Sequence, residues 1–211
     1  MVSWVIFPMF LVTVHLAKIV RSHTHSCPQV SNIPVQSGFD FNRFAGGHKW
    51  NLVLYNKIMP IEGLEMPVDK SDVAFLFSRN ASDAQVVSIE GRVSLAPSLA
   101  FCLDITGAIN NPPEHPAKLR QTYYNPITKK MFSFNFWILH TDYKNLAVVY
   151  DCEKTMTDGT CSPGNIYLWT LSRGTNHTVV EKAKIKELGD TVCMDVSSLR
   201  QVKHNSTCPT A

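Results

Sequence analysis

The sequence predicts an all-β fold, an eight-stranded antiparallel up-and-down β-barrel with one C-terminal α-helix packed on the barrel. Most of the chain consists of short apolar or alternating runs rich in Val, Ile, Phe, Tyr and Trp, separated by turn residues. One helical run follows the last of them. A length of 211 residues, with 45 % hydrophobic and 18 % charged residues, is typical of one globular domain and excludes a disordered or coiled-coil chain.

Eight segments have the composition and length of β-strands. Turn formers such as Asn80, Asn125-Pro126 and Asp158-Gly159 separate them. Eight strands in close succession are typical of an up-and-down barrel or of a sandwich. The predicted strands are Trp50–Tyr55, Val73–Ser78, Gln85–Glu90, Leu99–Thr106, Lys118–Tyr124, Phe132–His140, Leu146–Cys152 and Ile166–Ser172.

The segment Thr178–Leu188 breaks this pattern. It places Val179, Ala183 and Leu188 among charged residues, and Gly189 follows as a stop signal, so it predicts an amphipathic helix. A single helix after the eighth strand is not typical of an immunoglobulin-like sandwich. It therefore favours a closed barrel with the helix on its wall.

The N-terminal segment predicts export. Val2–Ala17 contains no charge and is shorter than the roughly 20 residues that span a bilayer. Its small residues near Val20-Arg21-Ser22 suit cleavage, so we expect a signal peptide over residues 1–22 and a single secreted domain over residues 23–211. A signal anchor that stays attached is the alternative.

The charge balance excludes two classes of partner. The net charge of +3 falls to +1 once Lys18 and Arg21 leave with the signal peptide, and no basic run remains. We therefore expect neither nucleic acid nor an anionic membrane surface as a partner, and no membrane span after cleavage. Asn80, Asn176 and Asn205 begin glycosylation sequons, which an exported chain can use.

No enzyme motif is present. The sequence has no Ser/His/Asp signature, no phosphate loop and no zinc-ligand spacing, which predicts a protein without catalytic residues, metal or resident cofactor. Cleavage after Ser22 would leave His23-Thr24-His25 at the new terminus, a pattern that can hold Cu(II). We expect a solvated tail there instead.

Several motifs occur in a fixed order between residues 27 and 209. They are Cys27-Pro28, Pro34-Val35-Gln36, Phe39-Asp40, Trp50, Pro116-Ala117-Lys118-Leu119, Thr141-Asp142-Tyr143, Ala147–Cys152, Trp169 with Arg173, and Cys208-Pro209. Together they resemble the lipocalin family, and within it the apolipoprotein D-like and insect bilin-binding branch.

The resemblance implies a structural role for the most prominent motifs. In lipocalins the arginine packs over the tryptophan at the closed end of the barrel, a cation–π contact of about 0.5–2 kcal/mol, and here these are Arg173 and Trp50. Thr141-Asp142-Tyr143 would form a turn at the same end. The run Gly46-Gly47-His48-Lys49 is two residues longer than the family's motif before the tryptophan, so we expect a reshaped closed end.

The six cysteines allow 15 pairings. The resemblance implies the pairs Cys27–Cys152 and Cys102–Cys208, with the two remaining cysteines paired or free. Cys152–Cys161, across a predicted hairpin, is a competing arrangement. One lipocalin is a prostaglandin synthase with a thiol nucleophile, so a free, inward-facing Cys102 is an enzyme alternative.

The barrel interior is the expected binding site, because an eight-stranded barrel holds one small ligand. Every second side chain of a strand faces the same way, so an inward-facing Trp50 and Arg173 predict which side chains line the barrel interior. Phe134 and Phe136 share a face with Phe132, and packing between barrel and helix is their alternative. The predicted ligand-binding residues are Leu52, Leu54, Phe75, Tyr124, Phe134, Phe136, Val149 and Trp169.

Such an aromatic lining with few charges suits an apolar ligand, or an amphipathic one with a polar end. The sequence therefore predicts a secreted carrier of a small hydrophobic ligand such as a fatty acid, steroid or retinoid. A bilin or carotenoid carrier is one alternative. A salivary-type lipocalin that acts through its outer surface on a protein partner is another.

Overall fold

The computed structural model describes residues 26–57, 69–96, 99–125 and 129–205. The predicted signal peptide and His23-Thr24-His25 lie outside these residues. The described strands are β1 (Trp50–Tyr55), β2 (Asp69–Arg79), β3 (Gln85–Ala96), β4 (Leu99–Asn110), β5 (Lys118–Asn125), β6 (Lys130–Thr141), β7 (Ala147–Cys152), β8 (Ile166–Ser172) and β9 (Arg200–Gln201).

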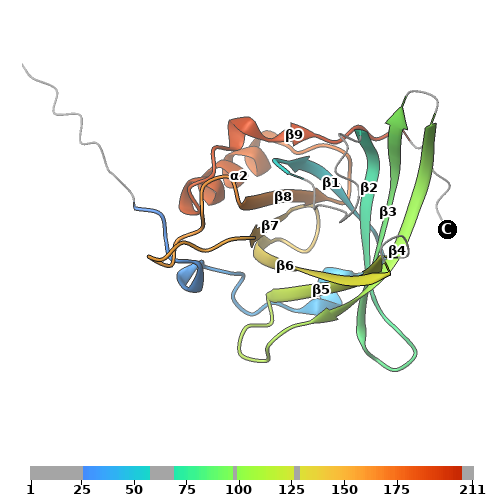
Figure 1. Cartoon of the computed structure of the whole chain (residues 1–211), viewed down its shortest axis with the longest axis horizontal. Coiled ribbons are helices and arrows are strands. Elements are labelled where there is room, and N and C mark those ends of the chain that lie inside the picture. The colour runs from blue at the N-terminus through green and yellow to red at the C-terminus, as the bar shows by residue number, and fades with distance from the viewer. Residues whose placement is uncertain (1–25, 58–68, 97–98, 126–128, 206–211) are drawn as a thin grey trace, which may run out of the picture.

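The strands form one antiparallel barrel (Figure 1). Their order is β2-β3-β4-β5-β6-β7-β8-β1-β9, and β1 also pairs with β2, at Trp50↔Phe75 and Asn51↔Ala74, which closes the sheet. The predicted up-and-down barrel is confirmed, with all eight predicted strands in place. β2, β3, β4 and β6 extend beyond their predicted bounds, because their ladders continue through residues outside each apolar run: mainly polar ones in β2, and a mixture of polar, small and apolar ones in β3, β4 and β6.

The seam between β1 and β2 holds a C-terminal segment that the sequence did not predict. The pairing of β1 with β2 covers only Trp50 and Asn51, and β9 pairs with the last residues of β1. Val202 N–H then donates to Val53 O at 2.9 Å, and Asp72 N–H donates to Lys203 O at 2.8 Å. The segment thus bonds to both strands and completes the wall.

A helix packs on the outer wall. α2 (Val179–Thr191) begins at its N-cap Thr178, whose hydroxyl bonds with Glu181 in a capping box. Its buried residue Ile185 joins a second apolar core formed with the outer face of β7 and β8, and Leu188 packs against that core. The predicted stop at Gly189 is wrong: the helix continues to Thr191, and this glycine lets Met194 O approach its Cα closely. Among the described residues, no helix has the length and apolar content to cross a membrane.

Aromatic side chains fill one half of the barrel interior. Short helix α1 (Phe41–Ala45), N-capped by Asp40, covers that end. Its Phe44 ring lies 5.0 Å from Trp50 and 4.9 Å from Phe77, centroid to centroid. Two short 3-10 helices, η1 (Val30–Asn32) and η2 (Val196–Ser198), lie outside the barrel sheet. The barrel therefore has one end closed by packed rings.

The disulfides correct the implied pairing. The structure pairs Cys152 with Cys161 and Cys27 with Cys193, so Cys27–Cys152 is wrong and the competing Cys152–Cys161 is found. The β7–β8 hairpin brings Cys152 and Cys161 within 5.8 Å, Cα to Cα, while the N-terminal segment meets the residue after α2. Cys102 is also disulfide-bonded, so the free thiol of the enzyme alternative is absent. Its predicted partner, Cys208, lies outside the described residues.

Candidate ligand-binding site

The closed end is built around Trp50, which is fully buried. The Arg173 guanidinium lies 3.8 Å from the centroid of its ring. Trp50 Nε1 and Arg173 Nη2 both donate to Phe44 O, each at 2.8 Å. Burial lowers the pKa of Arg173 to about 10, which leaves the side chain charged at neutral pH. Both side chains thus donate hydrogen bonds to backbone carbonyl groups at this end of the barrel, which supports a structural role for the pair.

The run Gly46-Gly47-His48-Lys49 lies beside this pair. Gly46 and Gly47 adopt left-handed φ angles of 51° and 71°, which glycine reaches without steric cost. A Cβ on Gly46 would lie 3.1 Å from Arg43 O and 3.2 Å from Arg173 Nη2. The loop then turns so that His48 O accepts a hydrogen bond from Arg173. This loop therefore contributes a backbone acceptor to the closed end. The reshaping of this end relative to other lipocalin-like barrels stays a prediction.

The Thr141-Asp142-Tyr143 turn lies at the same end. Asp142 Oδ1 accepts hydrogen bonds from the backbone N–H groups of residues 144, 145 and 146 at 2.8–2.9 Å. Burial raises the pKa of Asp142, but these three donors outweigh it and lower the pKa overall. Tyr143 carries the Arg43 guanidinium 4.2 Å above its ring. The turn stabilises the closed end and offers no acid–base pair.

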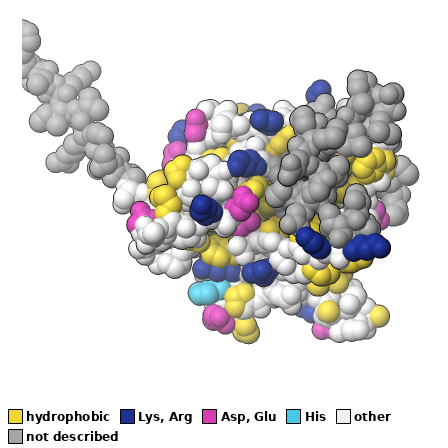
Figure 2. Space-filling model, in the orientation of Figure 1, with side chains coloured by type: hydrophobic (Ala, Val, Ile, Leu, Met, Phe, Trp, Pro, Cys, Tyr) yellow, Lys and Arg dark blue, Asp and Glu magenta, His cyan; other side chains and the backbone are white. Residues whose placement is uncertain are grey.

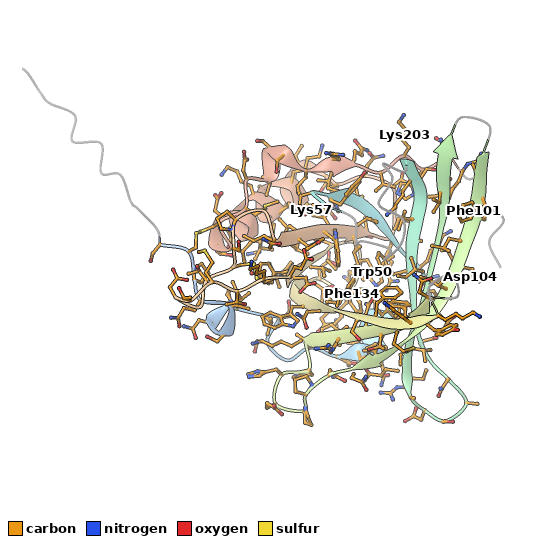
Figure 3. All side chains as sticks on the ribbon, viewed as in Figure 1. Trp50, Lys57, Phe101, Asp104, Phe134 and Lys203 are labelled. Atoms are coloured by element: carbon orange, nitrogen blue, oxygen red, sulfur yellow. A yellow bond between two sulfur atoms is a disulfide. The ribbon has the colours of Figure 1, made fainter. Side chains whose placement is uncertain are left out.

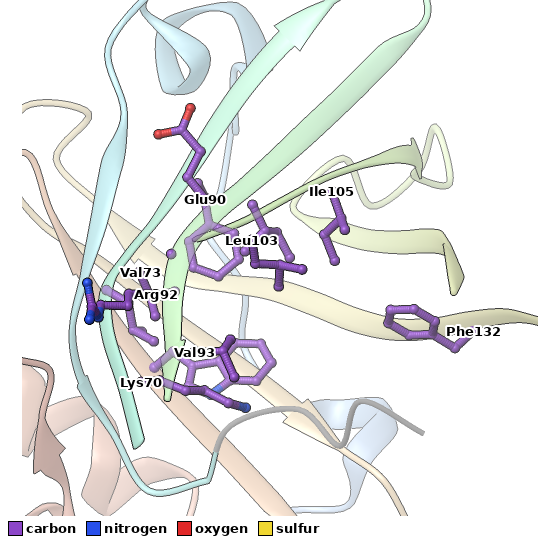
Figure 4. A pocket seen from close by; sticks show the side chains of 13 residues that line it. Lys70, Val73, Glu90, Arg92, Val93, Leu103, Ile105 and Phe132 are labelled. Carbon is purple, nitrogen blue, oxygen red and sulfur yellow. The ribbon is translucent and has the colours of Figure 1, made fainter. Parts of the chain in front are cut away.

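The other half of the barrel contains a cavity that opens to solvent, and the space inside it for the centres of water-sized molecules is about 60 Å³. Its surface is almost entirely apolar, and it lies among β2, β3, β4, β6 and β8 (Figure 4). The polar side chains at its edge are Lys70, Glu90 and Arg92. The apolar lining consists of Leu52, Val73, Phe75, Ile89, Val93, Leu103, Ile105, Phe132 and Trp169.

Six of the eight predicted ligand-binding residues face the barrel interior. Leu52, Phe75 and Trp169 line the cavity. Phe136 and Val149 are fully buried in the interior core beside it. Phe134 also faces the interior, where its ring lies 6.0 Å from that of Trp169 (Figure 3). The alternative for Phe134 and Phe136, packing under the helix, is therefore wrong.

Two of the predicted lining residues point elsewhere. A β-bulge shifts the register of β1 between Leu52 and Leu54, so Tyr55 rather than Leu54 lies opposite the inward Trp169. Leu54 instead pairs with Thr170 on the outer side. Tyr124 is 53 % exposed, because its neighbour Tyr123 takes the interior position. Leu54 and Tyr124 therefore do not line the cavity, and their prediction as ligand-binding residues is wrong.

Sequence reasoning missed much of the lining on β3 and β4. Ile89 and Val93 on β3, and Leu103 and Ile105 on β4, all face the cavity. Within each strand the two residues are an even number of positions apart, so their side chains lie on the same face of the strand. That alternation could have identified them. The sequence analysis identifies these strands by their apolar composition alone, which does not assign their faces.

The asparagines that begin the three sequons lie at the surface. Asn80, Asn176 and Asn205 are all exposed. Asn80 occupies the β2–β3 turn, where its Oδ1 accepts hydrogen bonds from Ser82 N and Ala84 N. Modification of the three asparagines stays a prediction.

No family model matches the chain. Retinol-binding protein 4-B of Oncorhynchus mykiss is 28 % identical over 181 residues, which cover 85 % of this chain and 97 % of that protein. Purpurin of Gallus gallus is 31 % identical over 157 residues, covering 72 % of this chain and 76 % of purpurin.

Solved structures show the same fold. Insecticyanin of the tobacco hornworm Manduca sexta superposes with a TM-score of 0.60 at 17 % identity, covering 88 % of this chain and 90 % of that chain. Lobster apocrustacyanin A1 gives a TM-score of 0.55 at 18 % identity, covering 84 % of this chain and 93 % of that chain. Both cover nearly the whole barrel.

Proposed function

The chain belongs to the lipocalin family, and we propose that it is a carrier that holds one small apolar ligand in the open half of its barrel. The apolar cavity bounded by Phe75, Leu103 and Trp169 is the observation that carries the proposal. Burial stabilises an apolar ligand by roughly 25 cal/mol per Å². A ligand burying on the order of 300 Å² gains about 7 kcal/mol before the costs of association.

The ligand class follows from the cavity and from the relatives. Relatives named as retinol-binding proteins support a ligand of retinoid size, and fatty acids and steroids share its apolar character. The ligand binds without covalent attachment, and the protein needs no resident cofactor. A disulfide occupies Cys102, the one candidate nucleophile, which supports a binding protein rather than an enzyme.

Secretion is part of the proposal. Residues 1–22 act as a signal peptide, and residues 23–211 form the exported domain. The disulfides Cys27–Cys193 and Cys152–Cys161 suit an oxidising compartment. On the face in Figure 2, basic and acidic side chains are interspersed rather than gathered into one patch, which supports a partner other than nucleic acid.

The test is native mass spectrometry of the protein purified from culture medium, with an absorbance spectrum of the same sample. Retention of one small molecule is the expected result, and visible absorption would identify a pigment instead of a colourless lipid. The empty protein is then titrated with retinol while tryptophan fluorescence is recorded. The proposal fails if nothing is retained and neither retinol nor hexadecanoic acid binds tighter than about 100 μM, roughly −5.5 kcal/mol.

A further inference from the structure

A lysine side chain lies on the interior face of the barrel at the edge of the apolar cavity. Lys70 pairs with Val93 across β2 and β3, and Val93 lines the cavity, so the side chain of Lys70 lies on the same interior face. Figure 4 shows Lys70 extending beside Val93. The amine of Lys70 is therefore within reach of the end group of a ligand in the cavity.

The neighbouring charged side chains lie on the outer face of the sheet. Glu90 and Arg92 are an odd number of positions from Val93 along β3, so their side chains point away from the interior. Lys203 in the C-terminal segment is exposed. Among the described residues that line the cavity, Lys70 is therefore the one whose charge faces the apolar interior.

The amine of Lys70 has no anionic partner among the described residues, where it forms neither an ion pair nor a side-chain hydrogen bond. Burial lowers the pKa of Lys70 to about 8, because the charged form loses hydration without gaining an anion. With that pKa about a fifth of the amine is neutral at pH 7.4, against about one part in a thousand for an exposed lysine. The neutral form of the amine is the nucleophile.

We propose that Lys70 captures an apolar aldehyde in the cavity as a reversible imine. The neutral amine adds to the carbonyl carbon and forms a carbinolamine. The carbonyl oxygen then leaves as water with the two amine hydrogens, and a C=N bond replaces the C=O bond. The reaction exchanges no electrons with a further reactant, so it needs no oxidant or reductant, and water reverses it.

The cavity favours this reaction in two ways. Burial of the apolar chain holds the aldehyde group beside Lys70, which raises its effective concentration at the amine. An apolar surface also excludes water, and water is a product of the condensation. The inference rests on the proposed carrier function and adds a class of ligand to it. An alcohol or an acid in the same cavity forms no imine and stays bound without a covalent bond.

The test uses retinal as the aldehyde probe and retinol as its unreactive counterpart. The full mature protein is incubated with retinal at pH 7.4, sodium cyanoborohydride reduces each imine to a stable amine, and peptide mass spectrometry locates the adduct. We expect the adduct at Lys70 to form about tenfold or more faster than at exposed lysines. An excess of retinol should slow this reaction by about fivefold, because it displaces retinal from the cavity.

Three variants separate Lys70 from the other amines. Lys70→Arg keeps the positive charge and Lys70→Met keeps the length of the side chain, and both should lose the adduct because neither has a nucleophilic amine. Lys203→Arg is the matched control, because it removes a neighbouring amine on the outer face. This control should keep the adduct at Lys70 at the unmodified rate.

Retinol binding, followed by tryptophan fluorescence in the same samples, distinguishes failure of the inference from failure of the carrier function. If retinol binds but the adduct is spread over exposed lysines without enrichment at Lys70, the inference is wrong and the carrier function stands. The same conclusion holds if bound retinol does not slow the reaction at Lys70. If retinol does not bind and no adduct forms, both proposals are wrong.

Discussion

The two ends of the barrel differ in how their polar groups are used. At the closed end, Trp50, Arg173 and Asp142 each bond to backbone groups or to each other, and aromatic rings fill the space between them. At the open end, Lys70 and Arg92 border an apolar cavity with no ion pair to any described residue. The polar side chains at the closed end are thus hydrogen-bonded and packed among aromatic rings. The cationic side chains at the open end form no ion pair with the described residues.

The residues in recognisable sequence motifs therefore stabilise the fold, whereas the residues that line the binding cavity belong to no motif. Trp50 and Arg173 are easy to find because they meet a fixed geometric need. Leu103 and Ile105 need only be apolar and face inward. Substitutions at the closed end should therefore change stability, and substitutions at the open end should change affinity.

The largest effect is expected for Trp50→Ala. It removes a fully buried ring, its contact with Arg173 and its hydrogen bond to Phe44 O, so the free energy of unfolding should fall by about 3–5 kcal/mol. Urea denaturation followed by circular dichroism measures the loss. Tyr124→Ala, which removes a 53 % exposed ring, should stay within about 0.5 kcal/mol. Equal losses in both variants would contradict the contrast between the ends.

A smaller effect is expected for Leu103→Trp at the open end. The larger side chain fills the cavity, so retinol affinity should fall at least tenfold, about 1.4 kcal/mol, while the urea midpoint changes little. Thr106→Trp places the same side chain at an exposed position of the same strand and should leave affinity unchanged. Unchanged retinol binding in Leu103→Trp would show that the ligand lies elsewhere.

The smallest effect is expected for Asp142→Asn. The carboxylate accepts three backbone hydrogen bonds, so replacing its charge should cost about 1 kcal/mol at pH 7. The pKa of Asp142 is lowered in the folded protein, so its stabilisation is present above the ordinary value of 3.8 and is lost as pH falls through the lower folded value. The stability difference between the variant and the unmodified protein should shrink in that window. If the stability difference between the two proteins does not depend on pH, the negative charge of Asp142 is not the cause of the stabilisation.

The strands and the closed end were largely predictable because they depend on local pattern. The eight apolar runs identified eight strands, and Trp50 with Arg173 marked one end. The two-residue β9 was not predictable, since it is too short to show a period and forms only where β1 leaves a free edge.

The faces of the lining residues were harder to predict. Alternation placed Leu52 correctly, but it failed at Leu54, where a β-bulge adds one residue to the strand. Tyr123 and Tyr124 are equally apolar, and only the pairing of Tyr123 with Phe132 fixes which one faces inward. The C-terminal segment bonds to both β1 and β2 only in the folded barrel, and no local pattern in the sequence predicts that position.

Hydrogen exchange on the empty and the retinol-saturated protein tests the contrast between the two ends most directly. We expect amides that exchange by local opening to slow in the open halves of β2, β3 and β4, near Val73, Val93 and Leu103. Amides of α1 and of the Asp142 turn should exchange at the same rate in both samples. Slowing confined to α1 and that turn, with none near Leu103, would contradict the assignment of ligand binding to the open end.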